Sequence, residues 1–306
     1  MAGAAELRVL RRRIKSVQST KKITRAMELI AASRIAKARR AVQAARPYSA
    51  GMNRVVRHLS AFPQAKNHPV LRKHPGAGKT CVVVITSDRG LAGAYNINAI
   101  RTAYDARQEL LSHGEQVQMV CVGSKGASWL RFRNVEVERA YEGLSDQPSS
   151  DAARQVVDPI VRDYRDGTID QVVVVYTAFV NALIQRTTRA QILPIDIDNP
   201  IDITVDELKP EEEAGVHPEY LMDPGLDVML DALLPRYVQQ QLFAAMLESA
   251  ASEHASRQRA MKAATENAEE VIDTLTIKAN TARQAAVTSE ISEIVGGADA
   301  LARSAN

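Results

Sequence analysis

Neither glycine nor proline interrupts residues 4–46, which read AAELRVLRRRIKSVQSTKKITRAMELIAASRIAKARRAVQAAR. Residues 236–295 form a second uninterrupted segment, 60 residues long. Both segments are rich in Ala, Arg, Lys, Gln, Glu and Leu, the strong helix formers. At 1.5 Å per residue they predict helices of roughly 65 and 90 Å, too long to fold inside a compact domain of this mass. We therefore expect two helices that run out of a globular part and pack against each other.

Apolar residues recur every three or four positions along both segments. On the first they are Leu7, Leu10, Ile14 and Val17, then Ile23, Met27 and Ile30; on the second they are Val287, Ile291, Ile294 and Leu301. Between these stripes the expected contact surface is mostly alanine, and small residues let two helix axes approach closely. The pattern favours an antiparallel coiled coil, although the skip after Val17 argues against an unbroken heptad repeat. Two amphipathic helices lying flat on a domain remain the alternative.

The middle of the chain has the pattern of a parallel sheet. Three short β-branched runs are typical of buried strands: residues 81–86 (CVVVIT), 117–122 (VQMVCV) and 171–176 (QVVVVY). Three helical candidates alternate with them, at about residues 96–112, 125–131 and 151–164. This order predicts a Rossmann-like, mostly parallel sheet with crossover helices. A further strand at about 187–192 follows closely and is expected to pair antiparallel with the third.

These patterns divide the chain into five parts. They are an N-terminal shaft helix (1–60), a linker (61–78), a central α/β foot (79–193), an acidic loop-rich connector (194–224) and a C-terminal shaft helix (225–306). Asp223-Pro224 resembles an N-cap followed by proline at the first helical position. Pro235 predicts a kink or restart about ten residues into that helix. The predicted fold class is therefore α/β plus a long antiparallel coiled coil, in which the two terminal helices form a shaft.

The net charge of +3 conceals a strong asymmetry. Residues 1–60 hold 15 Lys and Arg against 2 Asp and Glu, whereas residues 194–232 hold 12 acids and one lysine. Such a separation usually indicates a basic arm with an acidic partner. With 45% hydrophobic and 25% charged residues, the composition excludes intrinsic disorder and a collagen-like chain.

The cysteines, the apolar runs and the N-terminus indicate the cellular compartment of the protein. Cys81 and Cys121 lie in apolar runs, which excludes a disulfide scaffold and favours a reducing compartment. No apolar run approaches the ~18–20 residues that a membrane span needs. The N-terminus lacks the apolar core of a signal peptide, so we expect a cytosolic protein.

Two glycine-containing segments invite comparison with phosphate-binding motifs. Residues 74–80 (HPGAGKT) end like a P-loop, but Lys73 stands where the first glycine is needed, and a strand follows instead of a helix. Residues 87–96 (SDRGLAGAYN) lie between a strand and a helix, where phosphate can bind. There, however, Asp88 replaces the first glycine of the dinucleotide fingerprint. We interpret this segment as a tight strand-to-helix turn, with a nucleotide-binding enzyme as the alternative.

The residues suited to metal binding and catalysis are poorly spaced for either. The six histidines form no i, i+4 pair, His254 stands alone on the long helix, and no two cysteines lie within four residues of each other. We predict no catalytic site, no cofactor and no bound metal. The basic N-terminal helix remains, and it suits an acidic protein collar. The alternative is a coiled-coil protein that grips nucleic-acid phosphates with this helix.

Several long motifs resemble the gamma subunit family of ATP synthases. Residues 20–34 (TKKITRAMELIAASR) resemble that family's N-terminal helix, and residues 87–96 resemble its SDRGL turn. Its C-terminal helix is matched by residues 234–237 (LPRY), 252–257 (SEHASR), 261–267 (MKAATEN) and 282–295. The resemblance is collinear over nearly the whole chain.

The resemblance implies the central rotor shaft of a proton-transporting ATP synthase, which couples c-ring rotation to conformational change at the beta-subunit catalytic sites. The motor would make ATP, or in reverse use ATP to pump protons. The shaft would turn inside three alpha and three beta subunits, and the foot would sit with the epsilon subunit on the membrane c-ring. Catalysis would take place in beta, so this chain would be a non-catalytic subunit without bound nucleic acid or membrane insertion.

The resemblance also implies a place in the cell and a set of contact residues. In the absence of a transit peptide and of the chloroplast two-cysteine insert, it favours a bacterial enzyme peripheral to the cytoplasmic face of the plasma membrane. The rotor–stator contacts would be Lys21, Lys22, Arg25, Met27, Arg257, Arg283, Gln284, Thr288 and Glu290, and the c-ring contacts would be Glu219, Tyr220 and Leu221. Ala279 departs from the family pattern, in which many relatives carry an aromatic residue.

Overall fold

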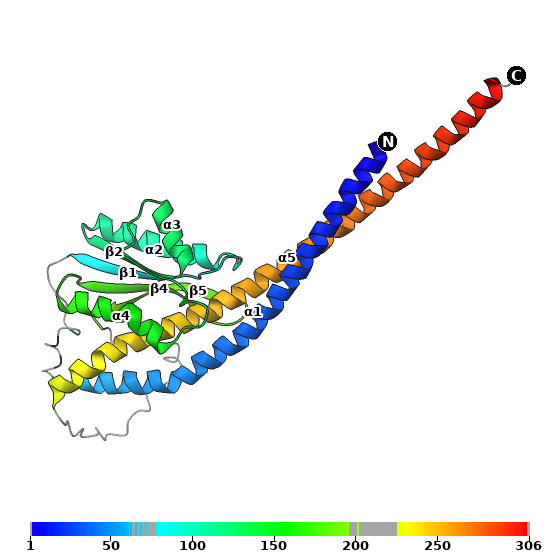
Figure 1. The fold of residues 1–306 in the computed structure, drawn as a ribbon. Helices are drawn as coiled ribbons and strands as arrows, with labels where there is room; N and C mark the ends of the chain where they lie inside the picture. Colours follow the sequence, from blue (N-terminus) through cyan, green and yellow to red (C-terminus); the bar gives the residue numbers. More distant parts are fainter. Residues whose placement is uncertain are drawn as a thin grey trace. The chain divides into compact units, whose positions relative to one another are not determined.

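The computed structural model describes residues 2–60, 78–195 and 225–304, together with residues 62, 65, 68, 71 and 201. They fall into two compact units. The first contains the residues up to Ile30 and those from Gln258 onward, and the second contains residues 31–257. Two helices, α1 (Ala2–Ser60) and α5 (Leu226–Ser304), each contribute to both units (Figure 1).

In the first unit α1 and α5 run antiparallel (Figure 1). Lys21 pairs with Glu269 and, further along α1, Thr24 pairs with Thr265, so the two chain directions are opposed. The buried positions recur at steps of three, four or seven residues: Thr24 and Glu28 on α1, and Met261, Thr265, Ala268, Leu275 and Ala279 on α5. The expected antiparallel coiled coil is confirmed.

The contact surface between these helix segments is more polar than the apolar spacing predicts. The hydroxyl oxygens of Thr24 and Thr265 lie 2.8 Å apart in it, and both residues are buried. Ile23 and Ile30, which the sequence pattern counts in the apolar stripe, are exposed instead, as is Ala26. Successive residues point about 100° apart around a helix. A rotation of α1 by one residue therefore places Thr24, and not Ile23, against the partner helix.

The second unit contains a five-stranded sheet in the order β3-β2-β1-β4-β5. The strands are β1 (Lys79–Ile85), β2 (Gln116–Val122), β3 (Arg139–Tyr141), β4 (Gln171–Phe179) and β5 (Gln185–Leu193). β1 pairs parallel with β2 and β4, β2 pairs parallel with β3, and β5 runs antiparallel to β4. The predicted mostly parallel sheet is confirmed, and so is the antiparallel strand expected at about 187–192, which is β5. β3 was not predicted, because its three edge residues carry no β-branched run.

Helices cover both faces of this sheet (Figure 1). α2 (Tyr95–Ser112) and α3 (Ser124–Phe132) pack on one face, and α4 (Ser150–Arg165) packs on the other with parts of α1 and α5. Side chains alternate along a strand, so Cys81 faces the α4 side and Val82 faces the α2 side. The three predicted crossover helices are confirmed, each within two residues of its expected ends.

α5 is continuous across Pro235, so of the predicted kink or restart the restart is wrong, and the kink stays a prediction. Proline inside a helix costs about 3 kcal/mol, because it removes a hydrogen bond and crowds the preceding turn. Leu230, Leu234 and Val238 are each buried in the core of the second unit. Burying such side chains contributes ~1.5–3 kcal/mol apiece, which outweighs the local penalty. The expected cap at Asp223-Pro224 lies outside the described residues.

Gly123 joins β2 to α3 with φ at +96°. A Cβ at this position would lie 2.2 Å from the carbonyl oxygen of Thr86. We expect Gly123→Ala to lower the free energy of unfolding by roughly 2–4 kcal/mol, because left-handed strain and a clash with backbone add together. Urea unfolding of the full chain measures the loss.

Gly143→Ala is the matched control for that substitution. Gly143 also has a positive φ, of +78°, but a Cβ there would meet no atom within 4 Å. Only the backbone strain remains, so the expected loss is about 1 kcal/mol. Equal losses at the two glycines would contradict the close approach of β1 and the β2–α3 turn.

Candidate functional site

The turn between β1 and α2 is closed by its own side chains. The N–H of Ser87 donates to Asn96 Oδ1 at 2.9 Å, and the Asp88 carboxylate accepts from the N–H of Ser124 at 3.0 Å. The hydroxyl of Ser145 donates to the same carboxylate at 2.8 Å. Asp88 therefore occupies the N-terminus of α3, where a negative charge is stabilised. A phosphate at this position would meet that carboxylate, so the geometry supports a structural turn.

Arg257 ties α5 to this turn. Its guanidinium donates to the carbonyl oxygens of Arg89 and Gly90 at 3.2 and 3.3 Å and to the Glu253 carboxylate at 2.6 Å. Arg257 and Glu253 are both buried. A buried ion pair is costly unless further hydrogen bonds satisfy it, and the two carbonyls do so here. Burial raises the pKa of Glu253 to about 6, against the opposing effect of the Arg257 charge.

α5 also completes the hydrogen bonding of β4. The last parallel pair between β1 and β4 joins Val84 to Val175, so among the described residues no strand lies beside the continuation of β4 on the β1 side. Polar side chains of α5 take the place of that strand. The bonds are Thr177 N–H to the Ser249 hydroxyl (3.2 Å), Ser252 hydroxyl to the Thr177 carbonyl (3.0 Å) and Phe179 N–H to the Glu248 carboxylate (2.8 Å). Since an unsatisfied buried donor costs ~1–3 kcal/mol, these bonds fix α5 on the sheet.

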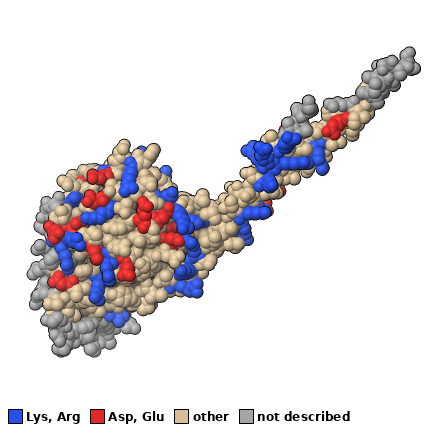
Figure 2. All heavy atoms as spheres, in the orientation of Figure 1, with Lys and Arg blue, Asp and Glu red and all other residues tan. Residues whose placement is uncertain are grey.

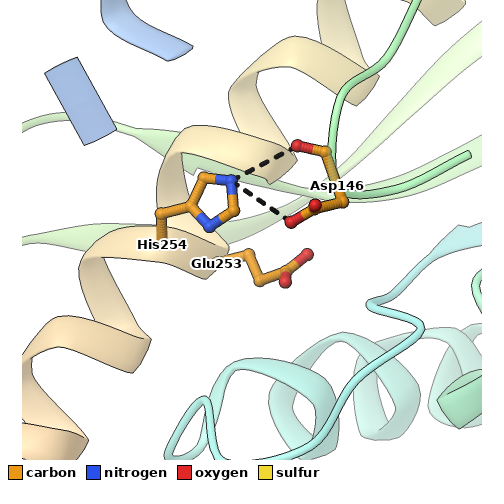
Figure 3. A group of neighbouring side chains, drawn as sticks. All are labelled: Asp146, Glu253 and His254. Atoms are coloured by element: carbon orange, nitrogen blue, oxygen red, sulfur yellow. Dashed lines mark hydrogen bonds and ion pairs between the residues drawn. The ribbon is translucent and has the colours of Figure 1, made fainter. Parts of the chain in front are cut away.

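Asp146, Glu253 and His254 form a polar cluster beside Arg257 (Figure 3). The His254 ring places Nε2 at 3.3 Å from the carbonyl oxygen of Asp146 and Nδ1 at 3.5 Å from Nη1 of Arg257. Burial lowers the pKa of His254 to about 4, so the ring is neutral at pH 7. A neutral ring that donates from Nε2 and accepts at Nδ1 satisfies both neighbours. His254 therefore holds the segment around Asp146 against α5.

This cluster is also the group of donors to consider as a metal site. One donor atom from each of the three residues lies within 4.8 Å of the others. Each carboxylate, however, already has a guanidinium partner: Glu253 pairs with Arg257, and Asp146 pairs with Arg34. A divalent cation would add positive charge to a largely buried group whose charges are already balanced. We therefore assign the cluster a structural role.

Lysine and arginine side chains gather over the N-terminal part of α1 (Figure 2). Within the first unit the exposed cations of this helix are Arg8, Arg11, Arg12, Arg13, Lys15, Lys22 and Arg25. Arg25 pairs with Glu28 on its own helix, and the half-buried Lys21 pairs with Glu269. Because their positions do not follow a single helical stripe, these cations surround the helix and present positive charge in several directions.

The other expected contact residues are divided between the two units. Arg283, Gln284, Thr288 and Glu290 are exposed on α5 of the first unit, and Met27 on α1 is half-buried. Arg257 belongs to the second unit, where it is buried. Glu219, Tyr220 and Leu221 lie outside the described residues. Among the described residues, no helix is both long enough and apolar enough to cross a bilayer.

A family model described as ATP synthase matches residues 6–301. An ATP synthase gamma chain of Frankia casuarinae is 48% identical over 303 residues, which cover 98% of this chain and 99% of that protein. The chain belongs to the ATP synthase gamma chain family. A further gamma chain, from Thermobifida fusca, is 45% identical over 302 residues, or 97% of both proteins.

Solved structures share the fold of this gamma chain family member. A chain of the Euglena gracilis mitochondrial ATP synthase, in a structure of OSCP, F1 and c-ring, matches with a TM-score of 0.64 at 19% identity. The match covers 97% of this chain and 95% of that one. A chain of the Tetrahymena thermophila central stalk and c-ring matches with a TM-score of 0.59 at 24% identity, over 79% of this chain and 99% of that one. Membership in the gamma family supports a central-stalk role over the nucleic-acid-binding and nucleotide-binding alternatives.

The neutral state of His254 makes a prediction for stability against pH. The folded chain keeps the ring neutral down to pH about 4, whereas the unfolded chain takes up a proton near 6.5. The folded state therefore binds fewer protons, and this contribution to stability is full above pH 6.5 and lost as the pH falls toward 4. The expected loss is roughly 2–3 kcal/mol.

His254→Asn removes this titration while leaving the pH dependence of Glu253 in place. We expect the stability difference between the original chain and the variant to shrink as the pH falls from 7 to 4.5, measured by urea unfolding at each pH. His113→Asn, at an exposed histidine, is the control and should show no such trend. A constant difference for His254→Asn would mean that the buried ring does not stay neutral.

Proposed function

We propose that this chain is the central rotor shaft of a proton-transporting ATP synthase. It couples rotation of the c-ring to conformational change at the beta-subunit catalytic sites, during ATP synthesis or during ATP-driven proton pumping. The observation that carries the proposal is the surface of the first unit, which combines exposed cations with exposed apolar side chains. Membership in the gamma chain family supplies the complex in which such a surface has a partner.

The apolar part of this surface is unusual for a free helix pair. Ile23, Leu29 and Ile30 on α1 are each more than half exposed, as are Ile291 and Ile294 on α5. Exposed apolar groups in such number mark a surface that another protein covers. A collar of alpha and beta subunits around the shaft is such a cover, and apolar contacts without directional bonds allow one surface to slide past another.

The cations of α1 suit an acidic lever, that is, an acidic loop of the beta subunits which the family resemblance implies faces this helix. Attraction between a helix ringed by cations and an acidic loop acts over several ångströms and needs no fixed pairing. Lys22 and Arg25 are exposed toward solvent, and Met27 lies beside them in sequence. We therefore keep Lys21, Lys22, Arg25 and Met27 as proposed contacts, together with the exposed α5 residues Arg283, Gln284, Thr288 and Glu290.

The second unit has the anchoring that a torque-bearing helix needs. A helix driven by a foot must not turn or slip within that foot. α5 is held to the β4 backbone by Glu248, Ser249 and Ser252, and to the β1–α2 turn by Arg257. Torque applied to the sheet is thereby passed to α5 through hydrogen bonds and the shared apolar core. Any direct collar contact of Arg257 would act on a side chain that is already part of this anchor.

The proposal also names the individual subunits that this chain contacts and the membrane face on which the complex lies. The shaft turns inside three alpha and three beta subunits, and the foot contacts the epsilon subunit and the c-ring, with Glu219, Tyr220 and Leu221 as proposed c-ring contacts. The complex sits on the cytoplasmic face of a bacterial plasma membrane. The chain carries no catalytic residue in this scheme, since the nucleotide chemistry takes place in beta.

The first test is the composition of the assembled complex. We expect a tagged copy of this chain, purified from native membranes, to be recovered with three alpha and three beta subunits per copy and with Mg-ATPase activity. Mass measurement of the intact complex gives the stoichiometry. Recovery of the folded chain without alpha and beta subunits would refute the rotor assignment.

Charge reversal tests the role of the basic helix. Lys22→Glu with Arg25→Glu should lower ATP-driven proton pumping roughly fivefold or more, because both charges then repel an acidic lever. The measurement is acidification of inverted vesicles at equal ATPase content. Lys262→Glu with Lys278→Glu, at exposed lysines of α5 in the same unit, is the control of equal charge change and should retain most of the pumping. Full pumping in the first variant would exclude an electrostatic role for Lys22 and Arg25.

A further inference from the structure

A pocket of about 220 Å³ lies in the second unit between α1, α5 and the segment that precedes α4. The apolar part of its lining comes mostly from small residues, among them Ala38 and Ala41 on α1 and Ala250 on α5. Leu247 and Pro148 complete the apolar part. Because alanines keep the helices from filling the space between them, the pocket is a consequence of the small residues that the sequence places there.

Polar groups from the same three segments also line the pocket. Arg34 and Lys37 are three residues apart on α1, so they share a helix face. Arg34 pairs with the Asp146 carboxylate through Nη1, and Lys37 Nζ donates to the amide oxygen of Gln147 at 2.9 Å. His254 on α5 also lines the pocket and is 2% exposed.

The charges of these lining residues do not cancel. The Asp146 carboxylate offsets the guanidinium of Arg34, while the described partner of Lys37 is a neutral amide. His254 carries no charge at pH 7, because burial lowers its pKa. Arg34 Nε and Nη2 make no hydrogen bond to a described residue, so they are available as donors. The pocket therefore offers one uncompensated cation and further N–H groups among apolar side chains.

The apolar lining residues make the water in this space replaceable. At ~30 Å³ per molecule the volume corresponds to about seven waters, which the alanine and leucine side chains cannot hydrogen-bond. Displacing poorly held water with an apolar group favours binding. The volume is below the ~300–1,000 Å³ of pockets for drug-sized ligands, so the fitting ligand is a fragment.

We propose that this pocket binds a small aromatic carboxylate. The flat apolar body lies against Ala38, Ala41 and Leu247, and the carboxylate accepts from Lys37 and from the unused donors of Arg34. Such a ligand touches α1, α5 and the segment at Asp146 at once, so it joins three parts of the second unit. The inference concerns binding to the chain itself and does not depend on the rotor assignment.

The test uses the full chain and 2-naphthoate as the probe, with saturation-transfer NMR and calorimetry. We expect a Kd on the order of 0.1–1 mM, as befits a fragment. The neutral analogue 2-naphthalenemethanol should bind at least about tenfold more weakly if the carboxylate meets Lys37 and Arg34. Equal binding of the two compounds, or no binding of naphthoate at about 5 mM, would overturn the proposal.

Paired variants place the ligand in this pocket. Lys37→Gln should weaken naphthoate binding about fivefold or more, and Ala41→Leu should abolish it by filling the space. Arg39→Gln and Ala44→Leu make the same changes at exposed α1 positions outside the pocket lining and should bind as the original chain does. Unfolding midpoints of all four variants check that they fold. Binding that survives Ala41→Leu would put the ligand elsewhere and overturn the assignment.

Discussion

The backbone of β4 beyond Val175 decides where α5 lies. β1 ends before β4 does, so Thr177 and Phe179 turn backbone groups toward the space that the next strand would occupy. Buried N–H and C=O groups must be paired. No strand in the described part of the chain continues beside them, and α5 supplies the partners through one carboxylate and two hydroxyls. This requirement places polar side chains on a helix face that would otherwise be apolar.

The polar residues around this contact form one connected arrangement. Arg257 balances the buried Glu253 and also reaches the turn after β1, and His254 meets both Arg257 and the segment at Asp146. Each member is held by at least one other, so the arrangement positions α5, two turns and α1 relative to one another within the second unit. A helix fixed in this way can transmit torque without rotating relative to the sheet of the second unit. This suits a subunit whose proposed task is to transmit torque.

The architecture was largely predictable, whereas the contact surfaces between helices were not. β-branched runs and the absence of glycine and proline are strong local signals, and the sheet, its antiparallel fourth strand and both long helices follow from them. The pairing of Thr24 with Thr265 gave no such signal. Apolar periodicity assigns Ile23 to the contact surface because it is apolar, and it does not include a threonine even where that threonine is buried. Glu248, Ser249 and Ser252 were overlooked for the same reason, although their clustering in an otherwise alanine- and leucine-rich helix is a sign of buried polar partners.

The amino-acid sequence by itself determined the helices and four of the five strands, the mostly parallel character of the sheet, the family and the basic character of α1. These properties depend on residue type and spacing along the chain. Only the tertiary structure decided which helix face is buried, that α5 passes Pro235 unbroken, and that Arg257 bonds to Glu253 and the β1–α2 turn. Those outcomes depend on which groups meet from distant parts of the chain, and the energy of burying or pairing them exceeds the local preferences that sequence patterns record.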